Sequence, residues 1–155
     1  MGTIYKAFKV RIYPNLKQQE TLNKTLGACR ALYNMMLYER IQTYERWKLS
    51  GEDIRVLYEH QNKTEKEYKK EYEWMNDSVD SQALQQSRIN LSVAYQNFFK
   101  SLKGQRKGSQ VGFPKFKKKR IGSSYRTMMT NNNIAINFET HKIKLPKVGY
   151  VNFKN

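Results

Sequence analysis

The fold is decided by one stretch near the start of the chain, Tyr5-Lys6-Ala7-Phe8-Lys9-Val10-Arg11-Ile12-Tyr13-Pro14. Its side chains alternate, with Phe8, Val10 and Ile12 pointing one way and the residues between them pointing the other. A period of two predicts a half-buried strand, which Pro14 ends. A single strand cannot stabilise itself, so this strand is expected to pair with strands elsewhere in the chain.

Three amphipathic helices are expected next, over about residues 16–47, 52–72 and 81–102. Asn15 and Gln18 resemble a capping box at the start of the first helix. Arg30 and Asn34, which lie beside its apolar stripe, are expected to be solvated. Apolar residues recur at helical spacing in the first and third helices. They are Leu22, Leu26, Cys29, Tyr33 and Met36 in the first, and Leu84, Leu91, Tyr95, Phe98 and Leu102 in the third. We therefore expect the helices to form a bundle through these faces.

Short alternating segments return after the helices and predict several strands. They are Ser124–Thr130, Ile134–Phe138, Ile143–Leu145 and Val151–Phe153. The order of strand, helices and strands predicts an α+β fold, a small β-barrel with a three-helix insertion after its first strand. The expected parts are residues 1–14, 15–103 and 104–155. The last strand has no following partner in the sequence, so we expect the chain to be truncated at its C-terminus.

The charge of the chain is concentrated in its C-terminal part. The whole chain has 29 Lys and Arg against 13 Asp and Glu, a net charge of +16. Residues 100–155 hold 14 of the cations and one acid, Glu139, whereas residues 1–99 hold 15 cations and 12 acids. A basic part joined to a nearly balanced part indicates a polyanionic partner. A basic membrane-surface helix is the rival, but it needs an amphipathic helix, and Pro114 interrupts the most basic block.

That block is Gly112-Phe113-Pro114-Lys115-Phe116-Lys117-Lys118-Lys119-Arg120, which has five cations in nine residues. Its cations, together with Arg126, are candidates to bind a nucleic-acid backbone through charge and counterion release. They are Lys115, Lys117, Lys118, Lys119, Arg120 and Arg126. Phe113 and Phe116 could stack on unpaired bases or anchor the loop to the fold, and anchoring is favoured. The alternative for the whole block is a solvated basic loop.

Other classes of function find little support in the sequence. A single cysteine, Cys29, excludes an internal disulfide and a Cys-x-x-Cys zinc site. No apolar run is long enough to span a bilayer, and early lysines interrupt any signal peptide. We therefore expect a cytoplasmic protein with no membrane partner. After residue 80 the only acid is Glu139, so clustered carboxylates for two-metal chemistry are missing there.

Several motifs, in this order and spacing, resemble the TnpB (OrfB) proteins of bacterial insertion sequences. The resemblance covers nearly the whole chain. It rests on Lys6–Pro14, Gln19, Leu26–Arg30 with Tyr33 and Asn34, Gly112–Arg120, Ser124–Thr127, Thr130–Ile134 and Ile143–Tyr150. The older label for this region of the family is a helix-turn-helix. That motif needs two short helices around a tight turn, and the long amphipathic stretches here favour it little.

The resemblance implies a function and a domain plan. TnpB proteins are transposon-encoded, metal-dependent RNA-guided DNA endonucleases. Their N-terminal half is a wedge barrel, oligonucleotide-binding-like, with a helical recognition domain inserted after the first strand. It holds a guide RNA from the transposon end and reads a short motif on double-stranded target DNA. A RuvC-like domain with three carboxylates follows, and it carries a four-cysteine zinc ribbon.

This chain departs from the family where the chemistry lies. The RuvC-like nuclease domain is absent from the sequence, so magnesium and zinc are expected only for the missing regions, with no cofactor and no catalytic residue in this chain. The resemblance therefore implies a nucleic-acid-binding N-terminal half that is nucleoid-associated and does not cut DNA alone. Two alternatives remain: a stand-alone non-catalytic DNA- or RNA-binding regulator or decayed remnant, and a basic structural protein such as a ribosome-associated one.

The resemblance also carries candidate residues for reading the DNA motif. In the family, the start of the third helix and a Thr-Asn pair after the basic block approach the target-adjacent duplex. The matching residues are Ser81, Gln82, Gln85, Thr130 and Asn131. Gln and Asn can form two hydrogen bonds with adenine, and a threonine methyl can contact the thymine methyl. The alternative is that the glutamines are helix-surface amides and Asn131 is a turn residue.

Overall fold

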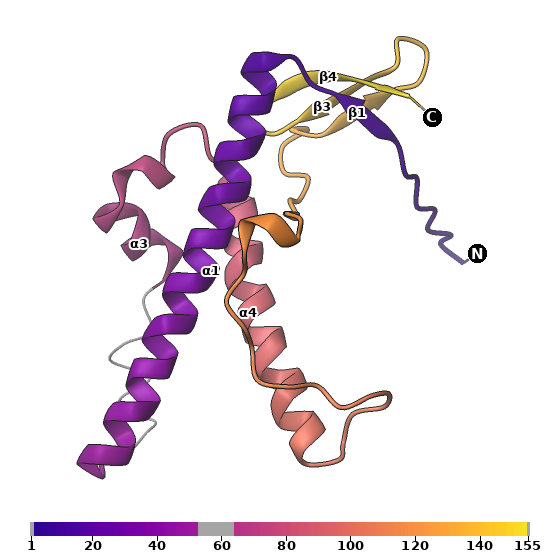
Figure 1. Ribbon diagram of the computed structural model, residues 1–155. Helices are drawn as coiled ribbons and strands as arrows, with labels where there is room; N and C mark the ends of the chain where they lie inside the picture. The colour runs from indigo at the N-terminus through magenta and orange to yellow at the C-terminus, as the bar shows by residue number, and fades with distance from the viewer. Residues whose placement is uncertain (1, 53–63, 155) are drawn as a thin grey trace. The chain divides into compact units, whose positions relative to one another are not determined.

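A computed structural model describes residues 2–52 and 64–154 of the chain, and Figure 1 shows its elements. It divides into two compact units. We call the first the sheet unit, which comprises the chain up to Asn23 and from Met128 onward. The second, Lys24–Thr127, is the helical unit.

The sheet unit is built on four antiparallel strands, β1 (Arg11–Tyr13), β2 (Ala135–Asn137), β3 (Lys142–Leu145) and β4 (Gly149–Lys154). Their order in the sheet is β1-β4-β3-β2. Ile12 of β1 lies opposite Phe153 of β4. The predicted pairing of the first strand with the C-terminal strands is therefore confirmed, and so is the α+β class. The described strands form an open sheet with β1 and β2 at its edges, so a closed barrel is not observed among them and stays a prediction.

One face of the sheet carries the apolar residues of the unit. Val151 and Phe153 on β4 are buried, and Ile143 on β3 lies opposite Val151. The Phe153 ring packs edge-on against Phe138, with ring centroids 6.0 Å apart. Phe138 in turn contacts Phe8 at 5.9 Å. The alternation of β4 therefore gives the buried face that the sequence predicted.

Two strand predictions were wrong. The first strand begins at Arg11, and residues 2–10 have no regular secondary structure because they pair with no described strand. Residues 124–130 also form no strand. There the Thr127 hydroxyl donates a hydrogen bond to the Asp80 carboxylate, and this contact fixes the segment against a helix.

The first helix, α1 (Leu16–Ser50), confirms its prediction. The capping box is present: the Asn15 N–H donates to Gln18 Oε1 at 3.0 Å, and the Gln18 N–H donates to Asn15 Oδ1 at 2.9 Å. Of the predicted stripe, Cys29, Tyr33 and Met36 are buried, whereas Leu22 and Leu26 are only half-buried. Leu32 and Leu37 are also fully buried, which widens the apolar face of the helix beyond that stripe.

The other helices of the described chain are α3 (Glu65–Glu71), a 3-10 turn η1 (Glu73–Met75) and α4 (Ser81–Leu102). The bounds of α4 match the prediction. The predicted second helix over 52–72 is observed only as α3, because residues 53–63 lie outside the described part of the chain.

One core joins α1, α3 and α4, as the apolar faces predicted. Its fully buried members include Leu32 and Leu37 of α1, Tyr68 of α3, and Leu84 and Leu91 of α4. The stripe of α4 ends earlier than predicted, because Phe98 is only half-buried and Leu102 is exposed.

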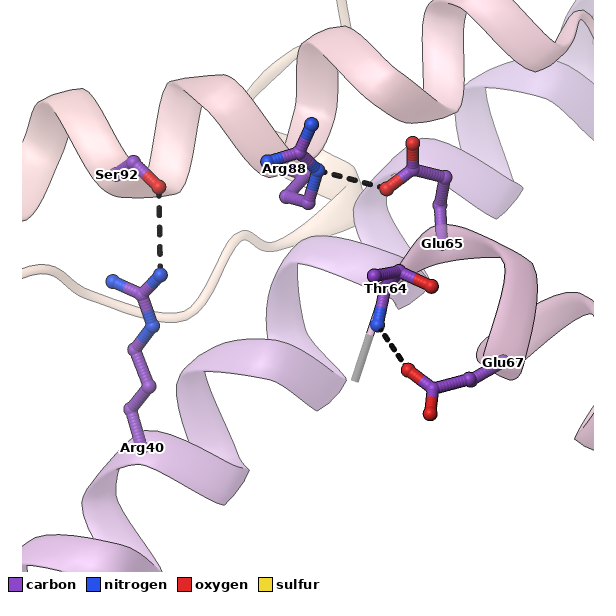
Figure 2. Close-up of polar contacts among 6 residues, drawn as sticks. All are labelled: Arg40, Thr64, Glu65, Glu67, Arg88 and Ser92. Carbon is purple, nitrogen blue, oxygen red and sulfur yellow. Dashed lines mark hydrogen bonds and ion pairs between the residues drawn. The ribbon is translucent and has the colours of Figure 1, made fainter. Parts of the chain in front are cut away.

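Polar contacts lock the helices around this core (Figure 2). The Arg88 guanidinium of α4 donates from Nε to Glu65 Oε2 of α3 at 2.7 Å. Arg40 of α1 donates to the Ser92 hydroxyl of α4 at 3.4 Å, and its guanidinium lies 4.8 Å from the centre of the Tyr95 ring.

Candidate nucleic-acid interface

The candidate interface is the basic segment, which we define as residues 100–126 of the helical unit. It contains ten lysines and arginines and no acid. Among the residues that the structure describes, none of these cations forms an ion pair. No acid of the described residues therefore neutralises this segment through an ion pair, and its charge is available to a polyanion.

An aromatic anchor holds the segment to α4. The Phe113 ring packs edge-on against Tyr95 at 5.5 Å and against Phe98 at 5.4 Å. The next residue, Pro114, is buried. Edge-to-face packing of this kind stabilises by roughly 0.5–1.5 kcal/mol beyond the burial of area. The ring contacts confirm the prediction that Phe113 anchors the loop, although the side chain stays partly exposed, at 44%. Phe116 is exposed to a similar degree and lines a pocket described below.

A side chain of α1 holds the middle of the segment. Asn34 donates from Nδ2 to the backbone carbonyl of Lys117 at 3.0 Å and accepts from the Lys117 N–H at 2.8 Å. The Lys117 ammonium also lies 4.6 Å from the centre of the Tyr33 ring. The expectation that Asn34 is solvated was therefore wrong. Asn34 pairs with the backbone as a strand partner would, so it fixes the path of the segment.

Asp80 holds the end of the segment at the start of α4. The buried carboxylate caps α4, accepting from the Gln82 N–H at 3.0 Å. Its other oxygen accepts the hydroxyl of Thr127. One carboxylate thus caps the helix and attaches the residue that follows the basic segment.

Between α1, α4 and residues 116–126 lies a pocket of about 310 Å³. Arg30, Lys118 and Arg126 contribute cations to its lining, and Leu26, Ala83 and Ile121 contribute apolar surface. The Arg30 guanidinium is oriented by a long contact of 3.5 Å to the Ser123 hydroxyl. Arg30, expected to be solvated, therefore belongs to this pocket.

Two titratable groups in the pocket lining stay neutral near pH 7. Burial, with the negative charge of Asp80 as a second cause, raises the pKa of Cys29 to about 12. The same two causes raise the pKa of Tyr125 to about 12. The lining therefore presents a neutral thiol and a neutral phenol beside its cations.

The structure places the predicted backbone-binding residues on exposed surface. Lys115, Lys118, Lys119, Arg120 and Arg126 are all exposed, and Lys119–Ile121 forms a short 3-10 turn, η2. Lys117 is exposed as well, but its ammonium is placed over Tyr33. It therefore combines a packing contact with its charge.

The predicted motif-reading residues divide between the two units. Ser81, Gln82 and Gln85 occupy the first turns of α4, where Ser81 is exposed and the two glutamines are half-buried. Thr130 and Asn131 are exposed and belong to the sheet unit.

Thr130 and Asn131 form a turn. Asn131 has a φ of 50°, in the left-handed region that asparagine tolerates better than most residues. Asn133 closes the turn, accepting from the Thr130 N–H at 2.7 Å. The turn role of Asn131 is therefore observed, and the DNA-reading role of both residues stays a prediction.

Residues 2–52 and 64–154 hold neither a cluster of metal-ligating side chains nor a membrane-spanning helix. Those residues contain no group of three or more His, Cys, Asp or Glu side chains that could hold a metal ion. Within the same residues, no helix is both long and apolar enough to cross a bilayer.

Arg30, Asn34, Asp80 and Tyr125 belong to the site, and none of them was predicted from the sequence to have a role in it. Asp80 had a detectable signal, since an aspartate directly before an apolar-periodic stretch is a typical N-cap. Asn34 lies 83 residues from Lys117 in sequence, so no local pattern marks their contact.

Comparison with known proteins agrees with the sequence motifs. Residues 1–48 match the helix-turn-helix domain of the OrfB proteins of the IS605 group. The chain is 38% identical over 119 residues to virulence protein VsdF of Salmonella dublin, a match that covers 74% of this chain and 93% of VsdF. The chain belongs to the OrfB (TnpB) family.

Two longer relatives are provisionally named RNA-guided DNA endonucleases. InsQ of Escherichia coli K12 is 30% identical over 153 residues, which is 97% of this chain and 34% of InsQ. A Streptomyces pristinaespiralis protein is 35% identical over 100 residues, 64% of this chain and 24% of that protein. The chain thus spans about a third or less of these two relatives.

The structure differs from the name of the matched domain. Residues 1–48 contain β1 and most of α1, and α1 is continuous from Leu16 to Ser50. These residues do not form two short helices joined by a tight turn. The sequence offered little support for a helix-turn-helix, and the continuous α1 confirms this for residues 16–48.

Proposed function

We propose that this chain is the nucleic-acid-binding N-terminal part of a transposon-associated, RNA-guided DNA endonuclease, and that it binds guide RNA and target-adjacent DNA. One observation carries the proposal: the basic segment has ten cations without an acid, and protein contacts hold it in place. Phe113, Asn34 and Asp80 supply those contacts. A preorganised cationic surface pays less conformational entropy on binding a phosphate backbone than a mobile loop does.

The proposal assigns two tasks to two sets of residues. The exposed cations of the basic segment hold the backbone of RNA or DNA without regard to sequence. Ser81, Gln82 and Gln85 read base edges from the first turns of α4, together with Thr130 and Asn131. Asp80 supports this assignment, because it connects the start of α4 to the end of the basic segment.

In this proposal the sheet unit is part of a wedge-type, oligonucleotide-binding-like barrel. The support is its antiparallel order β1-β4-β3-β2, in which the N-terminal strand pairs with the C-terminal one. Magnesium and zinc would serve the longer relatives through regions beyond the matched part, and this chain would act without a cofactor. Its partners place it in the bacterial cytoplasm, at the nucleoid.

The test is the affinity of the purified chain for RNA from its own transposon end. The chain should bind that RNA with a salt-dependent Kd well below that for unrelated RNA of the same length. Equal affinity for both RNAs would contradict a guide-RNA role and leave only general nucleic-acid binding.

A second candidate is a stand-alone, non-catalytic DNA- or RNA-binding regulator or remnant. The observation that favours it is VsdF, a relative that this chain matches over 93% of its length. This candidate predicts binding without cleavage. Metal-dependent cutting of DNA by the purified chain, abolished by one carboxylate substitution, would exclude it.

A further inference from the structure

The pocket between α1, α4 and residues 116–126 has the size and chemistry of a nucleotide site. Its volume of about 310 Å³ lies at the lower end of the range of small-ligand pockets, roughly 300–1,000 Å³. Its lining is neither purely apolar nor purely charged. The cations Arg30, Lys118 and Arg126 suit a phosphate, and the aromatic ring of Phe116 suits the face of a base.

Hydrogen-bonding groups of the lining are also unused. Within the described part of the chain, the side chains of Asn90 and Ser124 form no hydrogen bond, and both are exposed at the pocket. An amide and a hydroxyl can pair with the polar edge of a base or with a sugar hydroxyl. A free inorganic anion would leave this amide and the apolar surface without partners.

The pocket opens on the surface where a backbone is expected. Lys117 and Lys118 belong both to its lining and to the basic segment. A strand held by the segment would therefore pass its phosphates beside the pocket entrance. A paired base cannot leave its stack without cost, and an unpaired one can do so at a lower cost.

We propose that this pocket receives one unpaired nucleotide, turned out of the nucleic acid that the basic segment holds. This inference rests on the proposed function, because it needs a bound strand to deliver the nucleotide. It adds a distinct role for the helical unit: recognition of a bulge or unpaired position in the partner. The source strand is either RNA or DNA, since both supply a phosphate and a base.

The experiment compares hairpins that differ by one bulged nucleotide. Four RNA hairpins with a bulged A, C, G or U, their DNA equivalents and fully paired hairpins of both kinds are titrated with the full chain. At least one bulged hairpin should bind about tenfold more tightly than its paired counterpart, in line with the stacking of one base on a protein surface. Preference for bulged RNA, bulged DNA or both supports the pocket and identifies its source strand.

Filling the pocket should remove this preference. Asn90→Trp places an indole at the pocket from the exposed face of α4, and Ser124→Trp does so from the loop, so either variant serves if the other fails to fold. The ratio of paired to bulged Kd should fall to about one, from the roughly tenfold expected for one stacked base. Gln96→Trp, at an exposed site of α4 outside the pocket, is the matched control and should keep the ratio.

The outcomes separate the two proposals. Equal binding of bulged and paired hairpins, or a preference that survives both filling variants, overturns the pocket and leaves the proposed function intact. Failure to bind any hairpin by a chain that does bind its transposon-end RNA overturns the pocket alone, and failure to bind either kind of nucleic acid overturns both.

Discussion

Asp80 joins two parts of the helical unit through one side chain. Its carboxylate caps α4 through the Gln82 N–H and accepts the Thr127 hydroxyl. A buried acceptor with two donors cannot be removed without leaving those donors unsatisfied. Asp80 is therefore a structural residue beside the proposed motif-reading side chains.

Replacing this carboxylate should destabilise the helical unit. Asp80→Ala should lower the free energy of unfolding by about 2–3 kcal/mol, from a lost helix cap and a buried hydroxyl left without its acceptor. Thr127→Val removes one of the two bonds and should cost about 1 kcal/mol. Urea unfolding of both single variants and the double variant measures the coupling. Fully additive losses would show that the Asp80–Thr127 bond contributes nothing to stability.

Asn34 sets the path of the basic segment without adding charge. Asn34→Ala should increase amide hydrogen exchange at Lys117 and weaken RNA binding severalfold, because the segment must then be ordered on binding. The slope of log K against log salt should not change. Gln42→Ala removes an exposed amide from the same helix and is the matched control. Unchanged protection of Lys117 in Asn34→Ala would contradict a positioning role.

Cys29 and Tyr125 predict a loss of stability in alkali. Burial raises the pKa of Cys29 from 9.0 to about 12 and that of Tyr125 from 10.0 to about 12. The unfolded chain therefore releases these protons at lower pH than the folded chain does. The free energy of unfolding therefore keeps its full value, with respect to these two groups, below pH 9, and it falls as the pH rises toward 12.

Urea unfolding at neutral pH and at pH about 10.5 tests this loss. The free energy of unfolding should be lower in alkali, and Cys29→Ala should show a smaller drop than the parent chain. The tyrosines should account for what remains of the drop. The same drop in both proteins would show that Cys29 does not titrate as its burial requires.

At the scale of elements, the basic segment should contribute to binding through its positive charge. The start of α4 should contribute through which side chains it carries. Replacing Lys118, Lys119 and Arg120 with alanine should weaken binding to all sequences and reduce the salt slope by about 2–3. Replacing Lys66, Lys69 and Lys70, three cations in α3, is the matched control and should change the slope little.

Gln85→Ala should have the opposite signature. It should relax the preference among DNA motifs and leave the salt slope unchanged, because under the proposed function this half-buried amide contacts base edges, and an uncharged amide neutralises no phosphate. Competition binding with a library of flanking motifs measures the preference. If Gln85→Ala and the triple variant act alike, holding and reading are not separate tasks.

The elements were predictable where their periodicity is long. The apolar stripes of α1 and α4 predicted the existence of both helices, and the capping box at Asn15 predicted that α1 starts at Leu16. Alternation predicted β2, β3 and β4. The strand expected at 124–130 failed because the pattern does not show that Thr127 is held by Asp80, 47 residues away. Residues 5–10 belong to the same alternating segment as β1 and form no strand, since alternation indicates a face and not the presence of a partner strand.

At the scale of the molecule, the cations of the site were predictable from charge, and the contacts that hold them were not. The net charge of residues 100–155 identified the basic segment from composition alone. Asn34 looked like one more polar residue beside a stripe, and the pocket required the folded arrangement of three chain segments. The sequence thus predicted the cations of the surface, but not the contacts that hold the basic segment in place.

The two units should respond separately to damage in their cores. Val151→Ala in β4 should raise hydrogen exchange in β1 and β3, and Leu91→Ala in α4 should raise it in the helical unit. Each variant serves as the control for the other, because both remove a fully buried side chain. Increases spread evenly over both units in both variants would indicate a single cooperative structure.

The two hydrogen bonds of Asn34 both go to backbone atoms of Lys117. They therefore place no demand on which side chains the neighbouring positions carry. The lysines and arginines there can be exchanged by mutation over generations, or by an engineer in a library, while the main chain keeps its course. The side chains of the segment can therefore change, and affinity for a new partner can evolve, while the backbone fold stays the same.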